Sequence, residues 1–177
     1  MLGQILSLIQ DGRAGSWQAA LAAGLLGWVL VYYLVCAVRL WRIDVREHRL
    51  PDRIVLPMYP LLGLPLLGVM LLASDDSFAH ARETAYCSVL MLGFYWIMRA
   101  ASRGALGFGD VKLAGVLGML LGFISPVNLL WGNLLIFLTG GLTALGLVLT
   151  RRARFNTHIA FGPFMLLGTT IALLLPA

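Results

Sequence analysis

The feature that most limits how this chain can fold is a series of long apolar stretches separated by short, charged loops. A helix that crosses a bilayer needs about 20 mostly apolar residues. Six stretches meet or approach this length, at residues 17–41, 54–73, 84–98, 111–124, 127–150 and 158–175. The sequence therefore predicts an all-α, polytopic membrane protein with about six transmembrane helices.

The composition supports the same class of protein. The 177 residues are 60% hydrophobic and only 12% charged, with a mean hydropathy of +0.89, whereas a soluble domain is about a quarter charged and less than half apolar. We expect residues 1–177 to form one membrane-embedded domain. Leu2, Ile5, Leu6 and Ile9 have helical spacing, so residues 1–16 are interpreted as an interfacial N-terminal segment.

Basic residues gather in the loops that six alternating helices place on one side of the membrane. That side carries eleven of the thirteen lysines and arginines, namely Arg39, Arg42, Arg46, Arg49, Arg53, Arg99, Arg103, Lys112, Arg151, Arg152 and Arg154. Because cytoplasmic loops are enriched in Lys and Arg, we expect these loops to face the cytoplasm and both termini to face outward. The net charge of +5 reflects this loop bias, so no nucleic-acid partner is expected.

One of these basic loops ends in Gly107-Phe108-Gly109-Asp110, directly before an apolar stretch. A carboxylate at the mouth of a membrane helix is energetically costly, which makes Asp110 a functional candidate. The glycines allow positive φ angles and close approach of another segment. The alternative interpretation is a glycine turn whose aspartate caps the next helix. The motif gains weight only if a second carboxylate lies at the same depth.

A second carboxylate follows the first apolar stretch, in Ile43-Asp44-Val45-Arg46-Glu47-His48-Arg49-Leu50-Pro51-Asp52. Asp44 directly follows apolar residues, so we expect it at membrane depth on the same face as Asp110. Glu47 and Asp52 lie among arginines. For these two acids the favoured interpretation is a solvated side chain paired with a neighbouring arginine.

Two carboxylates in a partly desolvated site do not both ionise easily, so they share one proton. The ionised member can activate water, while the protonated member polarises a peptide carbonyl and then protonates the leaving amine. Other hydrolytic mechanisms have little support in the sequence. No serine lies in GxSxG, Cys36 and Cys87 lie in apolar runs, HExxH is absent, and His48, His80 and His158 do not form a metal cluster. We expect aspartyl hydrolysis without a metal ion or other cofactor.

Together these segments resemble the type IV prepilin peptidases, a family of bacterial GxGD-type intramembrane aspartyl proteases. The resemblance rests on Ile43-Asp44, Leu50-Pro51-Asp52 and residues 107–113. A further segment, Phe161-Gly162-Pro163-Phe164, is similar to the family's PFGP segment, although Ala160 stands where the family has proline. The resemblance covers residues 40–165.

The resemblance implies that Asp44 and Asp110 are the catalytic aspartates of a single peptidase domain. It also implies prepilin or pseudopilin substrates, with a short basic leader cleaved after a glycine and followed by an apolar helix. The site would lie at the cytoplasmic face of the bacterial inner membrane, in contact with lipid. Long family members carry a region with paired CxxC motifs tied to N-methylation. The chain has no CxxC, so it resembles the short, peptidase-only members.

Other residues of the GxGD motif are candidates for supporting or substrate-binding roles. Gly107 and Gly109, which flank Phe108, are expected to admit an extended substrate rather than only form a turn. Lys112 either tunes the charge of Asp110 or contacts lipid phosphate. A third interpretation is that its side chain simply extends toward the membrane interface.

The remaining candidates come from the other two motifs. Pro51 and Asp52 belong to the segment after Asp44, where Asp52 would receive a basic leader if it were not paired locally. Phe161, Gly162 and Pro163 either line the site or set the start of the last helix. For this segment the structural role is the favoured interpretation.

Two other functions stay open at this point. Proteases of the presenilin and signal-peptide-peptidase type also use GxGD, but pair it with a YD motif within a helix, whereas Asp44 follows isoleucine in a basic loop. A small channel or secretion scaffold would explain the spans and the glycines. It would not explain two aspartates in matching motifs at one membrane face.

Overall fold

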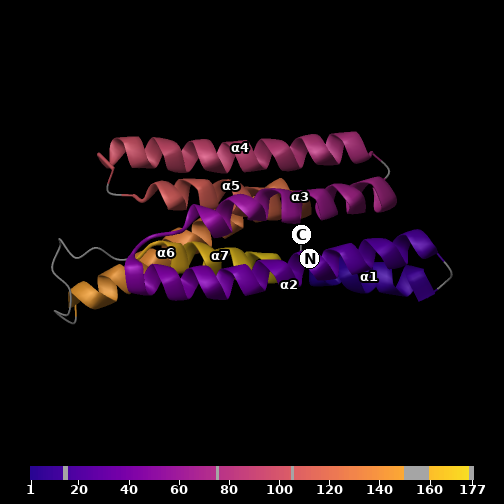
Figure 1. Ribbon diagram of the computed structural model, residues 1–177, viewed down its shortest axis with the longest axis horizontal. Helices are drawn as coiled ribbons and strands as arrows, with labels where there is room; N and C mark the ends of the chain where they lie inside the picture. The colour runs from indigo at the N-terminus through magenta and orange to yellow at the C-terminus, as the bar shows by residue number, and fades with distance from the viewer. Residues whose placement is uncertain (14–15, 75, 105, 150–159, 176–177) are drawn as a thin grey trace.

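The computed structural model describes residues 1–13, 16–74, 76–104, 106–149 and 160–175. Over these residues the chain is helical, without a strand. The described helices are α1 (Leu2–Arg13), α2 (Trp17–Glu47), α3 (Asp52–Ala73), α4 (Ser77–Ala101), α5 (Phe108–Ile124), α6 (Pro126–Leu149) and α7 (Gly162–Leu174). They lie side by side along one direction and form an elongated bundle (Figure 1).

The predicted all-α fold is confirmed, and the predicted apolar stretches correspond to α2 through α7. Among the described residues, α2, α3 and the first part of α6 (Pro126–Thr143) are long and apolar enough to cross a membrane. The apolar helix α7 is shorter. These helices and the composition identify an integral, polytopic membrane protein. The count of six spans stays a prediction.

Two helices, α2 and α4, extend six residues or more beyond the apolar stretches that predicted them, 17–41 and 84–98. α2 continues through the charged segment to Glu47, so Asp44 lies in its last turn and not in a loop. The arginines of this segment are exposed, and an exposed charge does not oppose a helix. α4 begins at Ser77, where the Asp76 side chain accepts a hydrogen bond from the Ala79 N–H at 3.0 Å and caps the helix. Hydropathy alone misplaced both boundaries.

The most extensive helix packing is between α4 and α5. A Cβ added to Gly118 would lie 2.7 Å from the Cys87 carbonyl oxygen, and one added to Gly122 would overlap the Cys87 side chain. The Ser88 hydroxyl donates to the Gly115 carbonyl at 2.7 Å. Gly118 and Gly122 therefore have a packing role, because small residues let two membrane helices approach closely.

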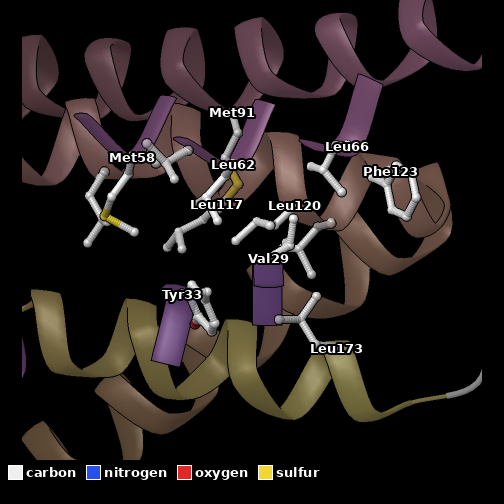
Figure 2. Close-up of a cluster of buried hydrophobic side chains, with 14 of the residues drawn as sticks. Val29, Tyr33, Met58, Leu62, Leu66, Met91, Leu117, Leu120, Phe123 and Leu173 are labelled. Atoms are coloured by element: carbon white, nitrogen blue, oxygen red, sulfur yellow. The ribbon is translucent and has the colours of Figure 1, made fainter. Parts of the chain in front are cut away.

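Buried side chains from five helices meet in the interior of the bundle (Figure 2). The labelled ones are Val29 and Tyr33 of α2, Met58, Leu62 and Leu66 of α3, Met91 of α4, Leu117, Leu120 and Phe123 of α5, and Leu173 of α7. In a membrane these contacts act mainly through van der Waals packing. The Tyr33 hydroxyl also donates to the Leu166 carbonyl at 3.0 Å, which joins α2 to α7.

The N-terminal helix α1 packs against the beginning of α2. The Met1 amino group donates to the Leu173 carbonyl at 3.3 Å, so the chain begins beside the end of α7. Ile5 and Leu8 pack against the core, whereas Leu6 is exposed. The predicted helix is present in residues 2–13, and its interfacial position stays a prediction.

Both aspartate motifs lie at one end of the bundle, on the left in Figure 1. At this end α2 finishes and α5 and α7 begin. Asp44 of α2 contacts Gly162 of α7, and Leu50 between α2 and α3 contacts Gly109 of α5. Segments far apart in the sequence therefore converge at one place.

Candidate active site

Asp44 is fixed in the last turn of α2. His48 adopts a left-handed conformation (φ 53°, ψ 36°), and its N–H donates to the Asp44 carbonyl at 2.9 Å, which ends the helix. Asp44 is only 4% exposed. Its Oδ2 accepts a hydrogen bond from the Gly162 N–H at 3.0 Å. A buried carboxylate thus faces the start of α7.

The start of α7 provides the donor for Asp44. Phe161 is the N-cap residue, Gly162 is the first helical residue and Pro163 follows it. The first N–H groups of a helix have no partner within the helix and carry partial positive charge, which suits a carboxylate. A Cβ on Gly162 would lie 2.6 Å from Asp44 Oδ2. The structural role predicted for this segment was therefore incomplete, since it starts α7 and also binds Asp44.

Asp110 lies in the first turn of α5 and is 8% exposed. Its Oδ2 accepts a hydrogen bond from the Gly107 N–H at 3.2 Å, which is the capping contact considered from the sequence. Its Oδ1 is buried and has no hydrogen-bond partner among the described residues. A buried polar atom without a partner costs about 1–3 kcal/mol. This oxygen is therefore the one left to bind water or a substrate.

The motif glycines allow close packing and do not adopt positive φ angles. Gly107 has φ −63° and ψ 143°, and Gly109 lies within α5. A Cβ on Gly107 would lie 2.9 Å from Asp110 Oδ2, and one on Gly109 would lie 2.7 Å from Leu50 Cβ. Of the two glycine properties considered from the sequence, close approach applies here and positive φ does not.

The two aspartates are neighbours in space. Asp44 and Asp110 lie close enough that their carboxylates would repel each other if both were ionised. Leu50 lies between the two motifs, with its Cβ against Gly109 and its Cδ2 3.3 Å from the position of a Cβ on Gly162. The structure therefore brings together two carboxylates that come from α2 and α5.

Lys112 and Asp52 form an ion pair beside the two aspartates. Lys112 Nζ lies 2.6 Å from Asp52 Oδ2 and 4.9 Å from the centre of the Phe108 ring. The Arg99 guanidinium lies 5.6 Å from the same ring. Asp52 thus pairs with Lys112, whereas the sequence indicated an arginine. An arginine is nearer in sequence, but the fold places α5 beside the first residue of α3.

Tyr95 is a residue near the site that the sequence did not indicate. The contact between Ser88 and Gly115 fixes the register of α4 on α5, and Tyr95 lies two turns further along, level with the first turn of α5. Tyr95 is fully buried, interacts electrostatically with Asp110, and donates its hydroxyl hydrogen to Asn133 Oδ1 at 3.2 Å. A single tyrosine in an apolar stretch gives no sign in the sequence that it lies near the two aspartates.

Two apolar grooves open on the sides of the bundle. One of about 530 Å³ lies between α4 and α6 and includes Phe94, Ile97 and Asn133. Another of about 380 Å³ lies between α2 and α7 and includes Trp41 and Arg42. Neither is lined by an aspartate of the pair. In the part of the chain that the structure describes, no group of three or more His, Cys, Asp or Glu side chains could hold a metal ion.

The arrangement of the pair suits general acid–base chemistry. Each carboxylate is fixed through one oxygen by a glycine amide, from Gly162 for Asp44 and from Gly107 for Asp110. Such fixation restricts side-chain motion and leaves the second oxygen for proton transfer. Two neighbouring carboxyl groups removed from solvent can divide the roles of base and acid between them.

Known proteins resemble this chain over most of its length. Residues 28–150, which include both aspartates, match the model of the type IV leader peptidase family. The chain is 35% identical over 164 residues to the prepilin leader peptidase/N-methyltransferase of Aeromonas hydrophila, an alignment of 91% of this chain and 51% of the relative. The protein of the same name from Pseudomonas aeruginosa is 32% identical over 161 residues, 90% of this chain and 50% of the relative.

A third relative with this name, from Escherichia coli, is 30% identical over 145 residues, which are 81% of this chain and 61% of the relative. The chain thus spans about half the length of the curated relatives first matched. No solved structure matches it significantly.

Proposed function

The chain belongs to the type IV leader peptidase family, and on that premise we propose that it is an aspartyl endopeptidase that removes the leader from prepilin or pseudopilin precursors. The observation that carries the proposal is the pair of buried carboxylates, Asp44 and Asp110, at one end of the bundle. Buried carboxylates in a membrane protein are energetically costly, so they are associated with function. Each also lies in a motif that resembles the corresponding family motif.

In the proposed reaction the dyad shares one proton. Its ionised member takes a proton from water as the water oxygen attacks the scissile carbonyl carbon, while its protonated member hydrogen-bonds the carbonyl oxygen. The tetrahedral intermediate collapses, the C–N bond breaks, and the leaving amine takes a proton from the dyad. The products are a leader with a new carboxylic acid, which then loses its proton to solvent, and a mature protein with a new amino group. The dyad again holds one proton.

Residues around the dyad are proposed to orient it and to receive the substrate. Gly162 and Gly107 hold the carboxylates through their amides. Phe108, Gly109 and Lys112 come from the start of α5, Pro51 and Asp52 from the start of α3, where Asp52 pairs with Lys112, and Phe161 and Pro163 from the start of α7. None of these residues needs to exchange a proton.

The site is proposed to face the cytoplasm at the bacterial inner membrane. The connection between α2 and α3, with Arg49, and the connection between α4 and α5, with Arg103, lie at the end of the bundle that holds the dyad (Figure 1). The three arginines at 151, 152 and 154, which also entered the orientation argument, lie outside the described residues. A precursor with a basic leader and an apolar helix would present its scissile bond at this interface.

Co-expression with precursors tests the proposal. The chain is expressed with a panel of prepilins and pseudopilin precursors, and leader removal is followed as a mobility shift on a gel and as a new N-terminus by mass spectrometry. The relative from Pseudomonas aeruginosa acts as the positive control. We expect cleavage after the glycine of the leader in at least one precursor. If the control cleaves the panel and this chain, present in membranes at a matched level, cleaves none, the proposed function is wrong.

A further inference from the structure

The strap between α2 and α3, defined as residues 48–51, packs between the glycines of the two other motifs, because Leu50 lies against both Gly109 and Gly162. It begins at the left-handed residue His48 beside Asp44 and ends at Pro51, the N-cap residue of α3. The next residue, Asp52, pairs with Lys112 of α5. The strap is therefore attached to the two helices that carry the candidate dyad.

Leu50 is the strap residue that fills the space between the two motifs. A Cβ added to Gly109 would lie 2.7 Å from Leu50 Cβ and 3.0 Å from the Leu50 carbonyl oxygen. A Cβ added to Gly162 would lie 3.3 Å from Leu50 Cδ2 and 2.6 Å from Asp44 Oδ2. The leucine side chain thus reaches from the residue before Asp110 to the residue that binds Asp44.

The surroundings of Leu50 also contain a group that needs a partner. Asp110 is more than nine-tenths buried, and its Oδ1 has no hydrogen-bond partner among the described residues. This oxygen belongs to the residue next to Gly109, against which Leu50 packs. Leu50 is therefore the strap residue that packs beside the turn of α5 that carries this oxygen.

We infer that Leu50 is a specificity-determining residue, whose side chain limits the substrate residue before the scissile bond to the smallest size. The inference rests on the proposed function, because it concerns the peptide that the dyad would cleave. With both facing positions occupied by glycine and the gap between them filled by leucine, a peptide backbone can approach the dyad but a substrate Cβ meets Leu50. Shortening this side chain creates free volume at the place where the substrate residue would lie.

The test compares two precursors that differ only in having glycine or alanine before the scissile bond. Initial rates of leader removal give a Gly/Ala ratio for each enzyme variant. Room for one methyl group changes such a ratio by about 10- to 200-fold, so Leu50→Ala is expected to lower the ratio at least about 10-fold. Leu72→Ala, which shortens a partly buried leucine of α3 packed against the core, is the matched control and should leave the ratio unchanged.

The outcomes separate this inference from the proposed function. The glycine precursor is one that the wild-type chain cleaves in the co-expression test, and if no precursor of the panel is cleaved there while the control cleaves them, the proposed function is wrong. If it cleaves the glycine precursor and Leu50→Ala lowers both rates equally, leaving the ratio as in wild type, Leu50 only supports packing and the inference is overturned. Leu50→Val supplies a smaller change, with an intermediate ratio expected.

A binding measurement decides the case in which the Leu50 variants are inactive. Leu50→Cys is combined with Asp110→Asn in a background where the free cysteines Cys36 and Cys87 are replaced by alanine. A precursor with a single cysteine before the scissile bond is added under oxidising conditions. We expect a disulfide-linked complex with Leu50→Cys and only background with Leu72→Cys. Absence of the complex with Leu50→Cys overturns the inference.

Discussion

Two glycine amides hold the candidate dyad, one on each carboxylate. The Gly162 N–H binds Asp44 and the Gly107 N–H binds Asp110. In both cases the missing side chain matters as much as the amide, because a Cβ would lie within 3 Å of the carboxylate oxygen that the amide binds. The two glycines therefore set how closely backbone and carboxylate can approach.

The change Gly162→Ala tests this role of the missing side chain. Its Cβ would lie 2.6 Å from Asp44 Oδ2, so the carboxylate or the start of α7 must shift. A displacement of about 1 Å in a catalytic group can lower the rate about 100-fold, and we expect a loss of that order in leader removal at matched protein levels. Gly141→Ala on α6, where a Cβ would have no neighbour within 4 Å, is the control and should retain activity. Equal activity in the two variants would contradict the close contact.

A second prediction at this scale concerns Asp52, one of the two acids in residues 43–52 that are not assigned to the dyad. Its side chain is 53% exposed and pairs with Lys112. Exposed ion pairs contribute about 1 kcal/mol or less. Asp52→Asn should therefore keep most of the activity, and Lys112→Gln should behave alike because it removes the same pair. Complete loss of cleavage in Asp52→Asn, with the protein still in the membrane, would assign Asp52 to the chemistry.

The acids of the site could be predicted from sequence, whereas their surroundings could not. Asp44 and Asp110 were singled out by their motifs and by their position beside apolar stretches. The contact of Gly162 with Asp44, the place of Leu50 and the proximity of Tyr95 depend on how α2, α4, α5 and α7 pack. No local pattern encodes contacts between residues so distant in sequence.

At the level of elements, the packing of α5 against α4 positions Asp110, one member of the candidate dyad. α5 carries Asp110 at its start and packs along α4 through glycines, with Gly118 against the Cys87 carbonyl. The Tyr59 hydroxyl of α3 donates to the Lys112 carbonyl at 2.8 Å on the other side of α5. The position of Asp110 thus depends on contacts along the whole helix.

The change Gly118→Ala should weaken this helix pair. The added Cβ would lie 2.7 Å from a backbone oxygen and cannot be relieved by a side-chain rotation. Overpacking of this kind costs about 1–3 kcal/mol, and each kcal/mol lowers the melting temperature of a protein of this size by about 2–4 °C. Tryptophan fluorescence during heating in detergent measures the shift.

Gly93→Ala is the matched control for that experiment. Gly93 lies in α4 with no atom within 4 Å of an added Cβ, so alanine there gains helix propensity without a clash. We expect its melting temperature to be equal to wild type or higher. If the melting temperature of Gly118→Ala equals that of Gly93→Ala, α4 and α5 do not pack as closely as described.

At the scale of the whole molecule, the candidate dyad lies at one end of the bundle. The connections after α2 and α4 lie at that end together with the dyad, whereas the connection between α3 and α4 lies at the other (Figure 1). The basic residues follow the same division, which is the pattern expected of a membrane protein whose dyad faces the cytoplasm.

Reporter fusions test this orientation. Fusions at Arg49, Arg103 and Arg152 should give a cytoplasmic signal, and a fusion at Ser77 should give a periplasmic one. Arg152 lies outside the described residues, so its prediction rests on the sequence alone. An external signal at Arg103 would place the GxGD motif on the opposite membrane face from the predicted one.

The fold was largely predictable because α2 through α7 are apolar over most of their length. What hydropathy missed were the ends of α2 and α4, where exposed charges continue a helix, and the resulting placement of Asp44 in a helical turn. Helix ends depend on caps such as Asp76 and His48, which act through single hydrogen bonds rather than through composition.

The dyad itself is tested most directly by leader removal in membranes with Asp44→Asn, Asp110→Asn and the double variant. Asparagine keeps the size of the side chain but can neither act as the ionised base nor carry the shared proton. Glu47→Gln is the matched control, because Glu47 is an exposed acid in the same turn of α2 as Asp44.

We predict no detectable cleavage in either single variant, no further loss in the double variant because the two groups act as a unit, and near wild-type cleavage in Glu47→Gln. Protein levels in the membrane are matched by blot. Near-full cleavage by Asp44→Asn or by Asp110→Asn would contradict the aspartyl dyad.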